Sequence, residues 1–217
     1  AMVAFHVSKI VFHLIAAGMF LMVSMISMKI FSRDYKDGSM ILFLSRSVVR
    51  WQYVLGRITG TWALCLVFMF ILHLTIFLTV WVKTGTIISG YLTASLVCSI
   101  NLLFVIACVC FLSLFMPDFI SAVFTMGILF VGFISDGGFQ IINSDIVKSA
   151  IPSAINGEAA LWRVAYPKVF MLQAYADAII SKSEFHTMGP IHPLLNLSLF
   201  ILLIMMLMLG SFNRKDI

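Results

Sequence analysis

The chain has 217 residues, of which 62% are hydrophobic and only 11% are charged, and its mean hydropathy is +1.09. A soluble domain is typically about 45–50% apolar and about 25% charged, and a soluble globule of this size would leave roughly 30% of its unfolded surface in water. The composition therefore excludes a soluble globular domain and a disordered chain, and four cysteines are too few for a disulfide-stapled domain. The sequence indicates an integral membrane protein.

Five stretches are long and apolar enough to cross a bilayer as helices. A spanning helix needs about 20 mostly apolar residues to cross roughly 30 Å of hydrocarbon. Apolar residues run continuously through these stretches instead of alternating, which argues against the strands of a membrane barrel. We therefore predict an all-α polytopic protein with one transmembrane domain, 1–217, and spans at about 9–30, 58–82, 91–116, 119–135 and 193–211.

The distribution of Lys and Arg predicts the orientation in the membrane. Cytoplasmic loops carry an excess of these cations close to the span ends. We therefore expect 31–57 and 212–217 in the cytoplasm, and 136–190 and residue 1 outside. An external first residue in a polytopic chain also leads us to expect a further span upstream of this sequence. The cations between the first two spans are Lys29, Arg33, Lys36, Arg46, Arg50 and Arg57.

The loop 31–57 contains a short apolar segment that cannot cross a bilayer. Asp37-Gly38 is a break signal, and the apolar run 40–44 follows it. Arg46 and Arg50 are four residues apart and would share one face of a helix. Two interpretations remain open: an interfacial helix held by lipid phosphates, or a helix that docks on a cytoplasmic partner.

The loop carries Asp34, Gly38-Ser39, Leu44-Ser45, Val48-Val49-Arg50 and Leu55-Gly56-Arg57 in that order. This order resembles the permeases of type-two ATP-binding cassette (ABC) exporters, whose pattern is similar to Glu-x-x-x-Gly-Thr, Leu-Leu-Ser-x-Pro-x-Ser-Arg and Leu-Gly-Lys. Asp replaces Glu here, and the Pro is missing. The final Phe-Asn-Arg-Lys-Asp-Ile of the chain is also similar to the family's Phe-x-Arg-Lys-Asp-Leu tail.

The resemblance implies spans two to six of a six-span permease in the bacterial inner membrane, surrounded by membrane lipids. It implies two cytoplasmic ABC ATPase subunits as partners, and a second permease copy or paralogue that completes the translocation path. The sequence contains no Gly-x-x-x-x-Gly-Lys-Ser/Thr loop, so we expect no enzyme activity and no cofactor in this chain. ATP and Mg would be bound by the partner ATPase, and no nucleic acid is expected. The implied ATPase-coupling residues are Asp34, Asp37, Gly38, Met40, Phe43, Leu44, Arg46 and Arg50.

The segment 136–190 is long for a plain loop and contains apolar stretches. Apolar residues recur at helical spacing after Pro167, which predicts a helix over 168–181. We expect an extracytoplasmic helical hairpin that is either a surface cap or, as the family implies, an outer gate. The expected gate residues are Trp162, Phe170 and Leu172.

Several polar or small residues inside the spans allow rival interpretations. His13 and His73 can be packing residues that bond to neighbouring helices, or functional groups within the membrane. Together with the four cysteines they keep a metal transporter or an intramembrane enzyme open as an alternative, and a non-transporting scaffold is the second. Gly56 and Gly60 are spaced for close packing of another helix. The cysteines are Cys65, Cys98, Cys108 and Cys110.

Overall fold

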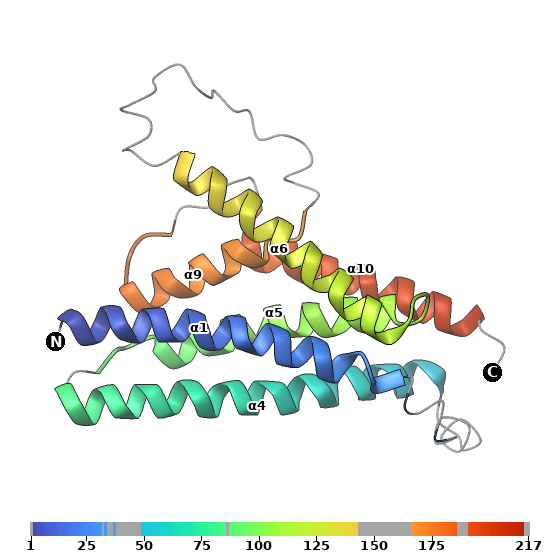
Figure 1. Ribbon diagram of the computed structural model, residues 1–217, viewed down its shortest axis with the longest axis horizontal. Helices are drawn as coiled ribbons and strands as arrows, with labels where there is room; N and C mark the ends of the chain where they lie inside the picture. The colour runs from blue at the N-terminus through green and yellow to red at the C-terminus, as the bar shows by residue number, and fades with distance from the viewer. Residues whose placement is uncertain are drawn as a thin grey trace.

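The computed structural model describes residues 2–31, 33, 37, 49–85, 87–142, 166–185 and 191–214, and all regular elements in this part of the chain are helices. The prediction of an all-α fold is confirmed for these residues. Five helices are long and apolar enough to cross a membrane, which fits an integral membrane protein, and α9 is shorter. In chain order the helices are α1 (Met2–Ser27), α4 (Arg50–Thr84), α5 (Tyr91–Leu112), α6 (Asp118–Ile142), α9 (Val169–Ser181) and α10 (Pro193–Arg214) (Figure 1).

Helix α5 forms the centre of the bundle and contacts each of the other described helices. Within the most apolar stretch of each helix, 67% of α5 is buried, against 17% of α4. A helix that is apolar on all sides lies either in a protein core or in contact with lipid. The buried fraction of each helix shows which of these two environments it occupies. Helix α5 is the core helix, whereas most of α4 faces outward and is available to lipid or to another chain.

The long helices alternate in direction, and their connections gather at two ends of the bundle (Figure 1). At one end the Tyr91 hydroxyl donates to the Ser8 carbonyl at 3.3 Å, so the start of α1 lies beside the start of α5. At the other end the Cys110 thiol lies 3.9 Å from the Ser27 carbonyl. The start of α1 and the end of α10 lie at opposite ends of the bundle, as an odd number of crossings requires.

The helix ends follow local chain chemistry. Helix α4 stops at Gly85, which has a left-handed φ of 66° and donates its N–H to the Trp81 carbonyl at 2.8 Å. Pro117 ends the short turn after α5, and Asp118 opens α6, where a carboxylate is favourable beside the helix N-terminus. Pro193 is the first residue of α10, a position that suits proline because its missing N–H would have no partner there.

Three helices extend past the span boundaries expected from the sequence. Helix α1 begins at Met2, and Lys9 lies inside it. Helix α4 begins at Arg50, so 50–57 of the expected coupling loop is helical. Helix α6 continues to Ile142, so the first part of the expected outer segment belongs to the fourth long helix. The predicted helix over 168–181 is confirmed as α9.

Helix α9 lies along the first half of α5. At its start the Val169 carbonyl accepts a hydrogen bond from the Asn101 side chain at 3.4 Å, and Asn101 is half-way along α5. Near its end, Ile179 lies against Gly90, the residue before α5, so closely that a Cβ added to Gly90 would be 2.7 Å from the Ile179 carbonyl oxygen. Helix α9 thus runs antiparallel to α5, from mid-bundle to the end where α1 begins.

Candidate functional site

Helices α1 and α9 are joined by a cluster of polar side chains. The Lys9 ammonium lies 2.9 Å from a carboxylate oxygen of Asp177 and also donates to the Ser181 hydroxyl at 2.9 Å. His13 Nε2 donates to the other carboxylate oxygen of Asp177, at 3.3 Å. Lys9 and His13 are four residues apart, as are Asp177 and Ser181, so each helix presents its pair on one face. The two faces match across the helix contact.

Gln173 extends this cluster by one turn of α9. Because the Asp177 carboxylate can only accept, His13 Nε2 carries a hydrogen, and His13 Nδ1 accepts from the Gln173 amide NH₂ at 3.1 Å. The amide oxygen of Gln173 then points away from His13 and has no hydrogen-bond partner among the described residues. Gln173 is only 5% exposed, and a buried acceptor without a donor is costly. This oxygen is itself closed off from solvent, so the fold bears that cost.

The charge of Asp177 is set by its neighbours. Burial on its own raises the pKa of this carboxyl group, but the hydrogen bonds from His13 and Lys9 and the positive charge of Lys9 outweigh burial and hold the pKa below its ordinary value. Asp177 therefore stays ionised at neutral pH and balances the Lys9 charge. The charges of Lys9 and Asp177 cancel, so the cluster carries little net charge.

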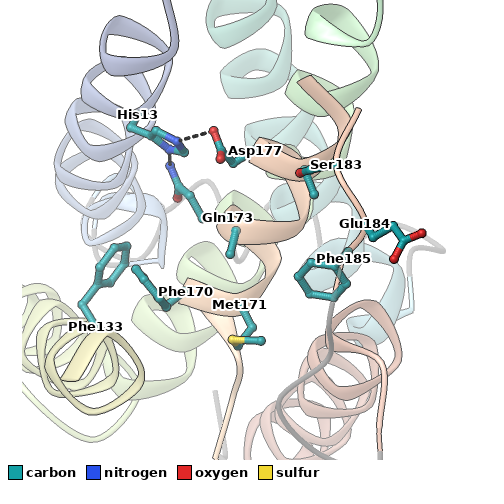
Figure 2. A pocket seen from close by; sticks show the side chains of 11 residues that line it. His13, Phe133, Phe170, Met171, Gln173, Asp177, Ser183, Glu184 and Phe185 are labelled. Atoms are coloured by element: carbon teal, nitrogen blue, oxygen red, sulfur yellow. Dashed lines mark hydrogen bonds and ion pairs between the residues drawn. The ribbon is translucent and has the colours of Figure 1, made fainter. Parts of the chain in front are cut away.

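A cavity of about 600 Å³ adjoins this cluster. Figure 2 shows His13, Gln173 and Asp177 on one side, and aromatic rings on the others. Phe133 comes from α6, and Ser183, Glu184 and Phe185 come from the segment that follows α9. The volume falls in the range of about 300–1,000 Å³ that small-molecule sites occupy. The described lining residues are His13, Phe133, Phe170, Met171, Gln173, Ala174, Asp177, Ala178, Ser183, Glu184 and Phe185.

The predicted gate residues have different positions. Phe170 lines the cavity and packs edge to face on Phe133, with 5.1 Å between ring centroids. Leu172, also on α9, is fully buried in the hydrophobic core. Trp162 lies outside the described residues. Of the three, Phe170 is therefore the one that the structure places at a cavity.

Most of the predicted coupling residues lie outside the described part of the chain. Asp37 is described and forms an exposed pair with Arg33, with Arg33 Nε 3.5 Å from an Asp37 oxygen. Arg50 is the first residue of α4. The coupling residues outside the description are Asp34, Gly38, Met40, Phe43, Leu44 and Arg46.

Gly56 and Gly60 lie on the exposed face of α4. A Cβ added at either position would meet no described heavy atom within 4 Å. Within the described part of the chain, no helix packs closely on this pair. The face is open to a helix of another chain, so close helix packing here stays a prediction.

His73 is buried where three helices pack together. Its ring is 0% exposed and stacks on Phe12, with 4.3 Å between ring centroids. Its Nδ1 accepts from the Ser95 hydroxyl at 2.8 Å, while Nε2 faces the Phe12 carbonyl at 3.5 Å. These contacts join α1, α4 and α5. Each imidazole nitrogen therefore already has a partner within the bundle.

The four cysteines are free and buried. Among the described residues, no three His, Cys, Asp or Glu side chains are close enough together to hold a metal ion.

The comparisons with known proteins give no relative for this chain: no family model, no curated protein and no solved structure matches it. Sequence reasoning missed Lys9, Gln173 and Asp177 as members of the cluster around His13. The available signal was a Lys inside the first apolar stretch and an Asp within the apolar helix 168–181, each of which needs a partner where little water reaches.

Removing one charge of the Lys9–Asp177 pair is expected to destabilise the contact between α1 and α9. The two side chains are 23% and 31% exposed, between a surface pair and a buried one, so Asp177→Ala should lower the free energy of unfolding by about 1–3 kcal/mol. The double variant Lys9→Met/Asp177→Leu should cost less than the sum of the two single changes, because it leaves no unpaired charge.

The measurement is a double-mutant cycle in denaturant, with unfolding followed by circular dichroism in mild detergent. The matched control is the Arg33–Asp37 pair, whose side chains are 79% and 61% exposed and whose coupling should be at most about 0.5 kcal/mol. Equal coupling energies for the two pairs would show that the cluster between α1 and α9 has no special weight.

Proposed function

We propose that this chain is a membrane-spanning permease subunit of an ATP-driven ABC exporter. The observation that carries the proposal is the placement of α9. A short apolar helix lies between the fourth and last long helices in sequence and packs along half of α5. This is the position at which the resemblance implies an extracytoplasmic re-entrant hairpin. The order of the loop motifs and of the C-terminal residues supports the same family.

The depth of α9 supports its interpretation as a re-entrant helix. With a rise of about 1.5 Å per residue, half of α5 measures about 16 Å, which is half of the roughly 30 Å hydrocarbon. Backbone that ends at mid-membrane is tolerated where protein buries it or where it lines a cavity. At the start of α9, the Lys168 N–H donates to the Asn196 side chain at 3.0 Å. The backbone at the start of α9 thus has a hydrogen-bond partner from the protein, as a backbone end at mid-membrane requires.

In the proposed mechanism, two partner ATPases bind ATP and close, and the loop 31–57 transmits that motion to the long helices. The coupling residues lie in the loop on the side of the membrane opposite α9. Closure moves packed helices as rigid bodies, and α9 changes its contact with α6 and α1 as the path opens outward. A second permease copy or paralogue supplies the other wall of the path. The exposed face of α4 with Gly56 and Gly60 is one surface on which helices of another chain could pack.

The test is purification of the tagged full-length protein from its native membrane in mild detergent. We expect an ATPase with a phosphate-binding loop to co-purify with it. Arg46→Glu should remove most of the bound ATPase and of the transport-linked ATP hydrolysis, because it reverses the charge expected at the docking loop. Lys83→Glu is the matched control: it makes the same reversal in the last turn of α4, at the opposite end of that helix, and should leave binding unchanged.

Two outcomes would contradict the proposal. Absence of any co-purifying ATPase, with the protein intact and folded, would favour the scaffold alternative. Equal ATPase binding by Arg46→Glu and the original protein would remove the loop 31–57 from the coupling mechanism.

A further inference from the structure

We infer that a groove between α1 and α6 binds one straight hydrocarbon chain of a membrane amphiphile and selects it by the shape of the chain. This chain groove has a volume of about 560 Å³. All of its described lining residues are apolar or glycine, so an occupant gains its contacts through apolar atoms. The described lining is Ala17, Phe20, Leu21, Val123, Met126, Gly127, Leu129, Phe130 and Phe133.

The chain groove has a buried part and an open side. Phe20 of α1 and Leu129 of α6 are buried, whereas Leu21 and Phe130 on its rim are exposed. Both helices are long and apolar enough to cross a membrane, so the open side faces outward from the bundle at the depth of the hydrocarbon. A hollow in a packed surface loses dispersion contacts when nothing fills it. Lipid chains are as apolar as leucine, so they suit this lining.

The dimensions of the chain groove fit a straight chain and not a helix of another protein. The groove follows α6 from Val123 to Phe133, which is about 15 Å at a rise of about 1.5 Å per residue. This length equals one leaflet, half of the roughly 30 Å of hydrocarbon. Spread over that length, the volume gives a mean cross-section of about 37 Å². A helix about 10 Å across occupies roughly 80 Å², so the groove is too narrow to take in a helix.

The width of the chain groove depends on Gly127, near its middle. A Cβ added to Gly127 would meet no described heavy atom within 4 Å, so the space beside this residue is open. Leucine at this position would fill part of that space without a clash. Leucine also has a higher helix propensity than glycine. Gly127→Leu is therefore expected to fold and to narrow the groove.

The polar end of the amphiphile would lie toward the first cavity, which shares Phe133 with the chain groove. The charged groups on that cavity wall leave little to select a head group. The Asp177 carboxylate is paired with Lys9 and His13, and Glu184 is exposed, where water screens its charge. Binding should therefore depend on the hydrocarbon chain and hardly on the charge of the head group.

Binding of the chain does not depend on transport; only its assignment as cargo rests on the proposed function. The experiment uses the full chain, without an ATPase, in nanodiscs of diphytanoylphosphatidylcholine, whose methyl-branched chains are wider than a straight chain. A dodecanol with a photoactivatable diazirine in its chain is cross-linked to the protein, and the labelled peptides are identified by mass spectrometry. Unlabelled dodecanol and cyclododecanol compete with it. They share the hydroxyl group and the number of carbon atoms, and differ in that one is a straight chain and the other a ring.

We expect the label on peptides that contain Leu21, Met126 or Phe130, and dodecanol should compete at least about tenfold better than cyclododecanol. Dodecylamine and dodecanoate should compete within about threefold of dodecanol. Gly127→Leu should lower the labelling of these peptides at least about fivefold, because the added side chain takes the place of the ligand. Gly18→Leu is the matched control: it makes the same change on α1, outside the described lining of the groove, where an added Cβ also meets no described atom, and should label like the original protein.

Equal competition by dodecanol and cyclododecanol, or label spread evenly over the outer faces of the long helices, would overturn the inference. Unchanged labelling in Gly127→Leu, with the fold intact by circular dichroism, would overturn it as well. A photoreactive residue in place of Leu21 that cross-links to a second protein copy and not to lipid would show that protein covers the groove, which also contradicts it. Chain binding in a protein that recruits no ATPase would contradict the proposed function and support the binding site, so the two failures can be told apart.

Discussion

Replacing Gly90 with alanine is expected to weaken the contact between α9 and α5 and to lower the free energy of unfolding by about 2–5 kcal/mol. Two costs act together. Gly90 has φ 92°, a left-handed conformation that side chains rarely adopt. A Cβ at this position would also lie 2.7 Å from the Ile179 carbonyl oxygen, a backbone atom that cannot rotate away. The change is therefore expected to move α9 as a whole.

Gly85→Ala separates these two costs. Gly85 also has a left-handed φ, 66°, but a Cβ there would meet no described atom within 4 Å, so only the conformational cost of about 1–2 kcal/mol applies. The measurement is thermal unfolding in detergent, with hydrogen exchange of 169–181 as a local readout. Exchange in α9 should rise in Gly90→Ala and stay unchanged in Gly85→Ala. Equal loss of stability in both variants would mean that the contact with Ile179 carries no weight.

Truncating His73 to alanine is expected to cost about 2–4 kcal/mol of unfolding free energy, because it opens a cavity where α1, α4 and α5 meet. The lost contacts are the stack on Phe12 and the hydrogen bond with Ser95. Packing of this kind is a main source of stability between membrane helices. Denaturant unfolding in detergent gives the value. The control is His6→Ala, an exposed histidine near the start of the same helix as Phe12, which should change the stability by less than about 0.5 kcal/mol.

The variant His73→Phe distinguishes packing from chemistry. Phenylalanine preserves an aromatic ring against Phe12 but cannot bond to Ser95 or transfer a proton. If His73 is a packing residue, His73→Phe should recover much of the stability lost in His73→Ala and preserve transport. Full stability with complete loss of transport would contradict the packing role and revive the intramembrane-enzyme alternative.

The long helices could be predicted because their determinants are local. A continuous apolar run long enough to cross a membrane leaves helix as the structure that satisfies its backbone, and Pro117 and Pro193 mark helix starts through their fixed φ. The helical spacing of Leu172, Ala176 and Ile180 likewise predicts α9 from the local sequence, and all three side chains are buried.

The helix ends and the polar cluster depend on information that a single sequence does not carry. The apolar run predicts a fourth span that ends at about 135, but α6 continues to Ile142. Lys9 stands at the edge of the expected first span, and its partner Asp177 is distant in sequence. Which face of α9 meets α1 is decided by how both pack on α5, and this packing brings Gln173 to His13.

Helix α4 is longer than the hydrocarbon layer is thick. Its 35 residues form one helix of about 52 Å, far longer than the roughly 30 Å of hydrocarbon. The charge-free stretch 58–82 measures about 37 Å and fits the bilayer with a moderate tilt. The two turns from Arg50 to Arg57 therefore extend past the hydrocarbon and are joined to the rest of α4 without a proline. They stay packed on the bundle there, because Tyr53 and Val54 are buried. A displacement of these two turns would therefore pass along α4 as a rigid rod to the helices on which it packs, α5 and α1.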